Sequence, residues 1–131
     1  MQDGTPLIAG GDINPARFVT LSTAANFTVL ESNSGDTKLY GISAEHTKNT
    51  PQTGSSALHA ESGDQPWIFE AGAKCKLKIG SGGCTAGDFL KPDNSGQGVT
   101  AAAAATAGAQ ALETAVEGEL AEVRVLHPTL L

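Results

Sequence analysis

The sequence predicts a mainly all-β protein, either a small antiparallel β-barrel or a sandwich of short hairpins. Glycine and other turn-forming residues occur along the whole chain, and short runs rich in β-branched and aromatic residues lie between them. Residues 74–79 also alternate strictly between polar and apolar side chains, which is the pattern of a half-buried strand. The length of 131 residues is that of one domain.

Three short segments in the first third of the chain are predicted strands. Residues 17–21 (RFVTL) are β-branched and aromatic, and residues 26–30 (NFTVL) alternate apolar with polar side chains. A turn cluster at residues 32–36 (SNSGD) separates them from a third segment at residues 38–43 (KLYGIS). We expect these strands to form a small meander.

Residues 45–65 predict a long polar loop, because the segment contains Pro51 and shows no periodicity. Loops of this length in compact domains are usually functional or disordered. Trp67, Ile68 and Phe69 follow the loop directly, and this apolar run predicts a buried strand.

The alternation over residues 74–79 predicts a strand with one buried face and one face of solvated lysines. The two sets are Cys75, Leu77 and Ile79 against Lys74, Lys76 and Lys78. The GSGG segment at residues 80–83 predicts a turn that would place Cys84 opposite Ile79 and Cys75 opposite Asp88. The two cysteines would then lie too far apart for a disulfide, so we expect free thiols in a reducing compartment.

The segment from Val99 to Leu126 fits two structures. Its alanines and glutamates favour a helix over residues 101–117, which Gly108 would interrupt. Alternation over residues 120–126 favours a closing hairpin that pairs residues 110–116 with 120–126. We predict the hairpin, with the alanine run as a loop or weak strand, and keep the helix as the alternative.

Composition restricts the class of function. The formal net charge is −6, which disfavours nucleic acids and anionic membranes as partners. No run approaches the roughly 20 apolar residues that span a bilayer, and no signal peptide is visible. Only 27 residues are Leu, Ile, Val or Phe, so the core is thin. We therefore expect stabilisation by oligomerisation or by docking on a larger body.

No catalytic, metal or cofactor motif is present. His46, His59 and His127 have no acidic residue or cysteine at motif spacing, and we interpret them as surface residues. Nucleophile-elbow, P-loop, EF-hand and zinc patterns do not occur. We expect a protein that is not an enzyme and that uses no cofactor.

We divide the chain into an extended N-terminal arm (1–12), a β-rich domain (13–126) and a C-terminal tail (127–131). Both ends carry apolar residues, namely Pro6, Leu7 and Ile8 near the start and Leu130 and Leu131 at the end. These ends either fold back on the domain or reach a neighbouring subunit, since exposed apolar ends are unfavourable on a monomer.

Residues 13–126 resemble the small capsid decoration, or cement, proteins of tailed bacteriophages. The matching elements are Arg17-Phe18-Val19, Gly41-Ile42, Ala86 to Leu90, Asp93 to Gly96, Ala111-Leu112-Glu113 and Gly118-Glu119. The loop at 45–65 and the alanine run depart from the family pattern.

The resemblance implies a structural protein on the outer capsid surface of the virion, made in the host cytoplasm. It would bind the major capsid protein as a homotrimer, bridge its subunits and stabilise the expanded icosahedral head against DNA pressure. We expect the contacts at Pro6, Leu7, Ile8, Leu130, Leu131 and the Trp67-Ile68-Phe69 segment. The alternative is a free-standing β-sandwich binding module, such as a fibre or adhesion domain, that recognises a glycan or surface ligand through loop 45–65.

Overall fold

The structure is a computed structural model that describes residues 7–45, 49–50, 54–55 and 58–131. These residues form strands and turns and contain no helix, which confirms the all-β prediction. The strands are β1 (Ile8–Ala9), β2 (Phe18–Leu21), β3 (Thr28–Glu31), β4 (Leu39–Ser43), β5 (Asn49–Thr50), β6 (Gly54–Ser55), β7 (Ile68–Phe69), β8 (Lys74–Lys78), β9 (Phe89–Pro92), β10 (Gly98–Thr100), β11 (Thr106–Ala111) and β12 (Leu120–Leu130).

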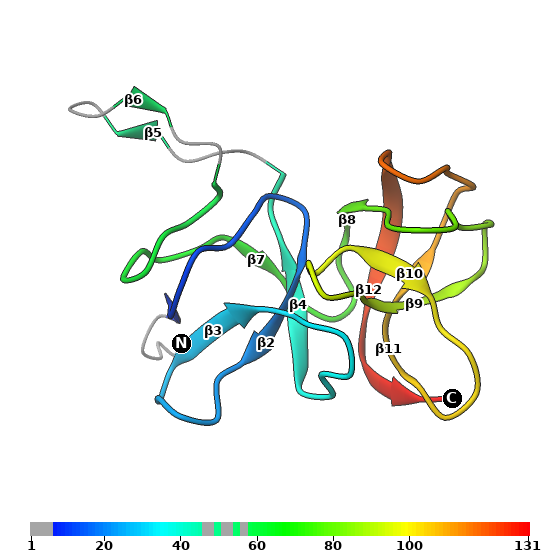
Figure 1. Ribbon diagram of the computed structural model, residues 1–131, viewed down its shortest axis with the longest axis horizontal. Helices are drawn as coiled ribbons and strands as arrows, with labels where there is room; N and C mark the ends of the chain where they lie inside the picture. The colour runs from blue at the N-terminus through cyan, green and yellow to red at the C-terminus, as the bar shows by residue number, and fades with distance from the viewer. Residues whose placement is uncertain (1–6, 46–48, 51–53, 56–57) are drawn as a thin grey trace.

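The first sheet has the strand order β1-β3-β2-β4-β7 (Figure 1). β1 runs parallel to β3, and the other pairs are antiparallel. The predicted meander is wrong, because β4 pairs with β2 and not with β3. The physical reason lies in β2, where the adjacent residues Phe18 and Val19 are both buried. A strand with apolar residues on both faces suits the middle of a sheet, whereas β3 buries Val29 alone.

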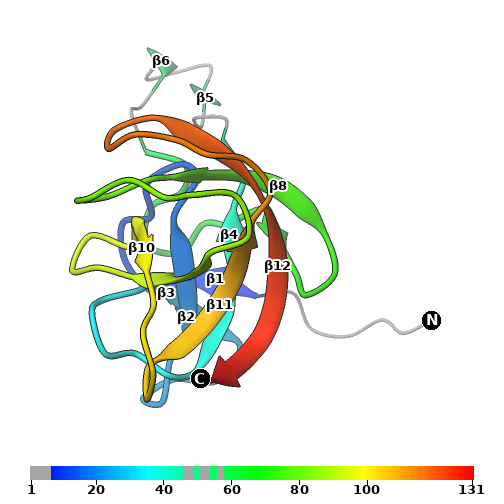
Figure 2. The same cartoon turned by 90° about the vertical axis from the view of Figure 1, so that its right-hand side faces the viewer.

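The second sheet, with the order β10-β9-β11-β12-β8, curls into a partly closed barrel (Figure 2). A parallel bridge between Ile79 and Gly98 joins its two edges, and the Gly80 N–H donates to the Gly98 carbonyl at 2.8 Å. Gly98 permits this closure, because a Cβ there would lie 2.5 Å from Leu77 Cδ2. The curled sheet therefore surrounds most residues of one hydrophobic cluster.

Alanines fill the inside of this barrel. Ala107, Ala109, Ala111 and Ala121 are at most 1% exposed, and they face the interior from β11 and β12. Small side chains allow strands to curl closely around a narrow core. The helix considered for residues 101–117 does not form, because burial of these alanines in a sheet outweighs their intrinsic helix propensity. Residues 101–105 lie outside strands, as predicted.

The closing hairpin is present with shifted bounds. β11 pairs with β12 so that Ala111 lies opposite Val123, and residues 112–119 connect the two strands. The predicted pairing of residue 75 with residue 88 is wrong. Cys75 lies opposite Val123, and Cys84 bridges to Ala115. Both cysteines are buried free thiols, as expected.

The two sheets share one hydrophobic core. Phe18 and Ile42 of the first sheet belong to the same cluster as the interior residues of the second. Backbone hydrogen bonds also join the sheets, from the Phe18 N–H to the Gly96 carbonyl at 2.8 Å and from the Lys78 N–H to the Ala16 carbonyl at 2.9 Å. β4 lies next to β11 and β12 (Figure 1). The sheets therefore form one body.

The polar segment at 45–65, where the structure describes it, includes strands and a buried bridge. β5 and β6 pair as a short hairpin. Ala60 bridges to Ile13 and is buried in a second core cluster with Val19 and Val29. His59 is only 5% exposed, so its interpretation as a surface residue is wrong. His127 is exposed as predicted, and His46 lies outside the described residues.

Candidate protein-interaction surface

The Trp67-Ile68-Phe69 segment lies at an edge of the first sheet. β7 pairs with β4 alone, and Ile68 and Phe69 are half-buried. Trp67 is 62% exposed, and its ring centroid lies 6.4 Å from that of Phe69. The predicted buried strand is therefore wrong for Trp67, because a short edge strand is covered on one side only. Exposed aromatic residues of this kind are enriched at protein interfaces.

Two buried features hold this segment in place. His59 Nε2 accepts a hydrogen bond from the Trp67 N–H at 2.9 Å. Gly41 lies on β4, beside β7 in the same sheet, and a Cβ at Gly41 would overlap the Phe69 carbonyl oxygen. The backbone that carries Trp67 is thus held by a hydrogen bond to His59 and by close packing against β4.

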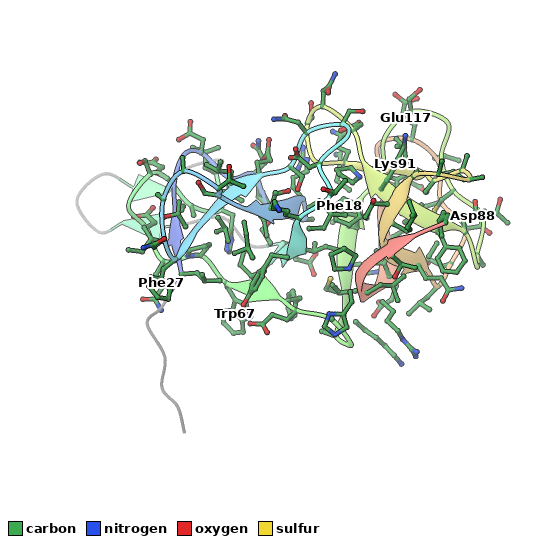
Figure 3. All side chains as sticks on the ribbon, turned by 90° about the horizontal axis from the view of Figure 1, so that it is seen from below. Phe18, Phe27, Trp67, Asp88, Lys91 and Glu117 are labelled. Carbon is green, nitrogen blue, oxygen red and sulfur yellow. The ribbon has the colours of Figure 1, made fainter. Side chains whose placement is uncertain are left out.

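A groove separates β7 of the first sheet from β8 of the second. Its volume is about 410 Å³, and we call it the junction groove. Its lining includes two aromatic rings, a thiol, and both lysine and glutamate side chains. Figure 3 shows Phe18 between the sheets and Trp67 on the first-sheet side of that position. The lining residues are Ala44, Glu45, Trp67, Phe69, Lys74, Cys75, Lys76 and Glu122.

Lys76 forms a small charge network beside the groove. Its Nζ lies 3.4 Å from Glu113 Oε2 and 3.7 Å from Glu122 Oε1. Glu113 also accepts a hydrogen bond from the Glu122 N–H at 2.7 Å. The pKa of Glu113 is lowered mainly by this backbone hydrogen bond and, to a smaller extent, by Lys76. The hydrogen bond with Glu113 is also the main reason that the pKa of Lys76 is raised.

The depressed pKa of Glu113 predicts a pH-dependent stability. The ionised carboxylate is favoured in the folded state, so its contribution is present above the unfolded glutamate pKa of about 4.3 and is lost as pH falls through the folded pKa. We expect Glu113→Gln to lower the urea midpoint at pH 7, with the difference disappearing in strong acid. Glu117→Gln is the control, because Glu117 lies on the same connection without a hydrogen bond or ion pair to any described residue. Equal effects of the two variants would contradict the network.

Cys75 lies at the floor of the groove and is chemically protected there. Burial raises its pKa to about 12, with smaller contributions from Glu122 and Glu45. Because the thiolate is the reactive form, we expect native Cys75 to react with iodoacetamide at pH 8 about a thousandfold more slowly than a free cysteine. Mass spectrometry of native and guanidinium-unfolded protein measures this ratio. Fast alkylation of the native thiol would show that the groove opens to Cys75.

The other predicted contact residues lie elsewhere. Pro6 is outside the described residues. Leu7 is half-buried against the second core cluster, and Ile8 is 43% exposed on β1, at the opposite edge of the first sheet from β7. Leu130 is 74% exposed at the end of β12. Leu131 is half-buried, and its backbone forms hydrogen bonds with the backbones of Ala104 and Ala105. The predicted contacts thus form three separate surfaces, and residues 127–130 continue the last strand.

Other exposed apolar residues were not anticipated from the sequence. Phe27 is 54% exposed at a turn with φ of 54°, and Val116 is 64% exposed on the β11–β12 connection. The sequence predicts a strand at Phe27, because no local pattern distinguishes this residue from a strand residue. Figure 3 shows Phe27 at the far end of the first sheet from Phe18. The sequence predicts a solvated face at Lys74 and Lys76, but the position of these lysines in a groove depends on the first sheet.

The described residues contain no group of three or more His, Cys, Asp or Glu side chains that could hold a metal ion. They also contain no helix long and apolar enough to cross a membrane.

Comparison with known proteins shows a structural similarity but no similarity in sequence. No family model matches the chain, and no curated protein matches its sequence. Among solved structures, the crystal structure of the head fiber gp8.5 N base of bacteriophage phi29 is similar, with a TM-score of 0.58 and 19% sequence identity. The similarity covers 97% of this chain and 96% of that one. The chain therefore shares the fold of that base over nearly its whole length.

Proposed function

We propose that this protein is a structural component of a bacteriophage head, bound to the outer surface of the capsid. The observation that carries the proposal is the shared fold with a phage head-fiber base over 97% of the chain. The short motifs between residues 13 and 126, which resemble capsid decoration proteins, support the same location. The proposed partner is the major capsid protein, and the proposed role is to bridge its subunits as a homotrimer.

The physical properties of the chain support a protein that works on a larger body. Its two sheets enclose a core in which many positions are alanine. Binding of the folded state alone adds stability by mass action, so a shell would compensate for this thin core. The net charge of −6 disfavours contact with packaged DNA. The proposal includes no catalytic activity and no cofactor.

A second candidate role follows from the nature of the matched protein. That protein is the N base of a head fiber, and this chain could serve in the same way as an attachment base. An attachment base needs to bind the shell, whereas a cement protein must also stabilise it. The two roles therefore differ in a measurable quantity, the disruption temperature of the shell.

Co-sedimentation with empty, expanded shells made from the major capsid protein alone tests the proposal. We expect binding at a fixed ratio to shell subunits, with a raised disruption temperature on heating. Binding without a change in that temperature would favour the attachment base. Absence of binding at saturating protein would overturn both roles. A glycan screen of the protein with and without residues 46–57, a deletion that keeps the buried His59 and Ala60, would then test the binding-module alternative in loop 45–65.

The exposed C-terminal leucine provides a residue-level prediction. Leu130→Asp should leave stability nearly unchanged, because the side chain is 74% exposed. If Leu130 contacts the shell, loss of its buried apolar area should weaken shell binding about tenfold. Thr129→Asp, which adds the same charge at the neighbouring exposed position, is the control. Equal binding by wild type and Leu130→Asp would remove this end of β12 from the interface.

A further inference from the structure

The edge of β8 that faces the junction groove is free at Lys74 and Lys76, whereas just after the strand Ile79 bridges to Gly98 of β10. β8 pairs with β12 alone, and Cys75 and Leu77 lie opposite Val123 and Ala121. The odd-numbered residues of β8 are those that exchange backbone hydrogen bonds with β12. The same phase continues just after the strand, where the Ile79 N–H donates to the Glu119 carbonyl at 2.9 Å. Antiparallel strands alternate in this way, so the even-numbered residues of β8 direct their N–H and C=O groups away from β12.

At Lys78, one of these even-numbered residues, a hydrogen bond shows that the backbone N–H points away from β12. The Lys78 N–H donates to the Ala16 carbonyl of the first sheet at 2.9 Å. Lys74 and Lys76 make no such backbone hydrogen bond to any described residue. Unpaired edges of this kind are templates for an added strand, and proteins usually cover them. Here the edge is left beside a space of about 410 Å³ whose opposite wall carries Trp67.

The charges at this edge indicate the sign of the charge on a segment that would bind there. Lys74 on β8 lies directly opposite Arg124 on β12, and like charges in that position destabilise a sheet. No described carboxylate forms an ion pair with Lys74 or Arg124. Lys76, in contrast, already pairs with Glu113 and Glu122. An acidic chain thus holds an uncompensated pair of cations next to an open strand edge.

We propose that the free edge of β8 accepts an extended acidic segment of the shell protein as an added strand. Its backbone would pair with Lys74 and Lys76, and its carboxylates would lie against Lys74 and Arg124. Alternate side chains of the segment would face the apolar part of the groove, where Phe69 and Cys75 lie. Glu45, on the other wall, disfavours carboxylates on that side. The identity of the partner rests on the proposed function, whereas the recognition chemistry rests on the groove.

A peptide experiment tests the recognition chemistry without any shell. The probe is a seven-residue peptide that alternates glutamate with valine, titrated into the full chain labelled with ¹⁵N. We expect saturable shifts of the Lys74 and Lys76 amide signals. A peptide alternating lysine with valine, and the glutamate peptide with every internal backbone nitrogen methylated, should each give much smaller shifts, because one lacks the negative charge and the other lacks the backbone donors. Equal shifts with all three peptides, or none with any, would overturn the proposal.

Shell binding tests the same surface in its proposed context. The double variant Lys74→Glu with Arg124→Glu should bind empty shells at least about tenfold more weakly than wild type, because both cations face the partner. Lys38→Glu with Lys91→Glu makes the same change in net charge outside the groove and is the matched control. An equal loss of shell binding in both double variants would show that the effect comes from net charge alone and would contradict the proposal.

Blocking the backbone separates strand addition from simple charge attraction. Lys76→Pro removes the outward N–H, and proline is tolerated on an edge strand where the N–H faces away from its neighbour. Lys76→Ala removes the same side chain but keeps the N–H. We expect Lys76→Pro to weaken shell binding more than Lys76→Ala, at equal urea midpoints. If Lys76→Pro fails to fold, the N-methylated peptide remains the test of the backbone contact.

The two proposals fail in different ways. If the wild type does not bind shells while the glutamate peptide shifts Lys74 and Lys76, the proposed function is wrong and the groove remains an acidic-strand site. If the wild type binds shells while the peptide gives no shift and the groove variants bind normally, the proposed function stands and this inference is wrong.

Discussion

Phe18→Ala is expected to destabilise the protein by about 3–5 kcal/mol, the range for large-to-small aromatic substitutions in a core. Phe18 is only 1% exposed and belongs to the cluster that spans both sheets. Its ring lies against Gly108 of β11, where a Cβ would be 3.0 Å from Phe18 Cε1. Truncation therefore removes an apolar contact between the sheets and is expected to leave a cavity at their boundary.

Urea unfolding followed by the fluorescence of Trp67, the single tryptophan, measures this effect. A shift of the midpoint at constant m-value would report a change in stability alone. Phe89→Ala is the matched control, because Phe89 is 39% exposed on β9 and its removal leaves little cavity. Similar costs for the two substitutions would contradict a core shared by the sheets.

Local patterns in the sequence predicted those elements whose environment is set by near neighbours. The alternation around Cys75 and Leu77 correctly predicted the two faces of β8, because a strand with one solvent-exposed face alternates between polar and apolar residues. The closing hairpin was also found, since β11 and β12 are joined by a short connection. The strand β2 contained a clue to its central position in two adjacent buried residues, Phe18 and Val19.

The rest depends on contacts between distant segments. The bridge from Ile79 to Gly98 closes the barrel, and no local pattern specifies it. Cys84 pairs with Ala115 across 31 positions of sequence, which a turn at residues 80–83 does not predict. The same holds for the junction groove. The sequence singled out Trp67 as apolar and Lys74 as solvated, but only the packing of the two sheets brings them to one cavity.

Gly41→Ala is expected to detach β7 and to remove the groove with it. A Cβ at Gly41 would overlap the carbonyl oxygen of Phe69 and would lie 2.7 Å from Ile68 Cγ2. A backbone atom cannot turn aside as a flexible side chain can, so β7 must move. Overpacking of this kind costs about 1–3 kcal/mol, occasionally more. Because β7 is a two-residue edge strand, local separation should relieve the overlap before the whole domain unfolds.

This variant links the stability of the fold to the proposed interface, since the β7 segment carries Trp67 at the groove wall. We expect greater quenching of Trp67 by acrylamide and faster exchange of the Ala44 amide, which donates to the Trp67 carbonyl at 2.9 Å. Gly11→Ala is the control, because a Cβ at Gly11 meets nothing within 4 Å. If β7 forms one wall of the strand-accepting groove, Gly41→Ala should also bind shells more weakly than Gly11→Ala. Normal shell binding by a variant with a detached β7 would restrict the interface to β8 and the ends of the chain.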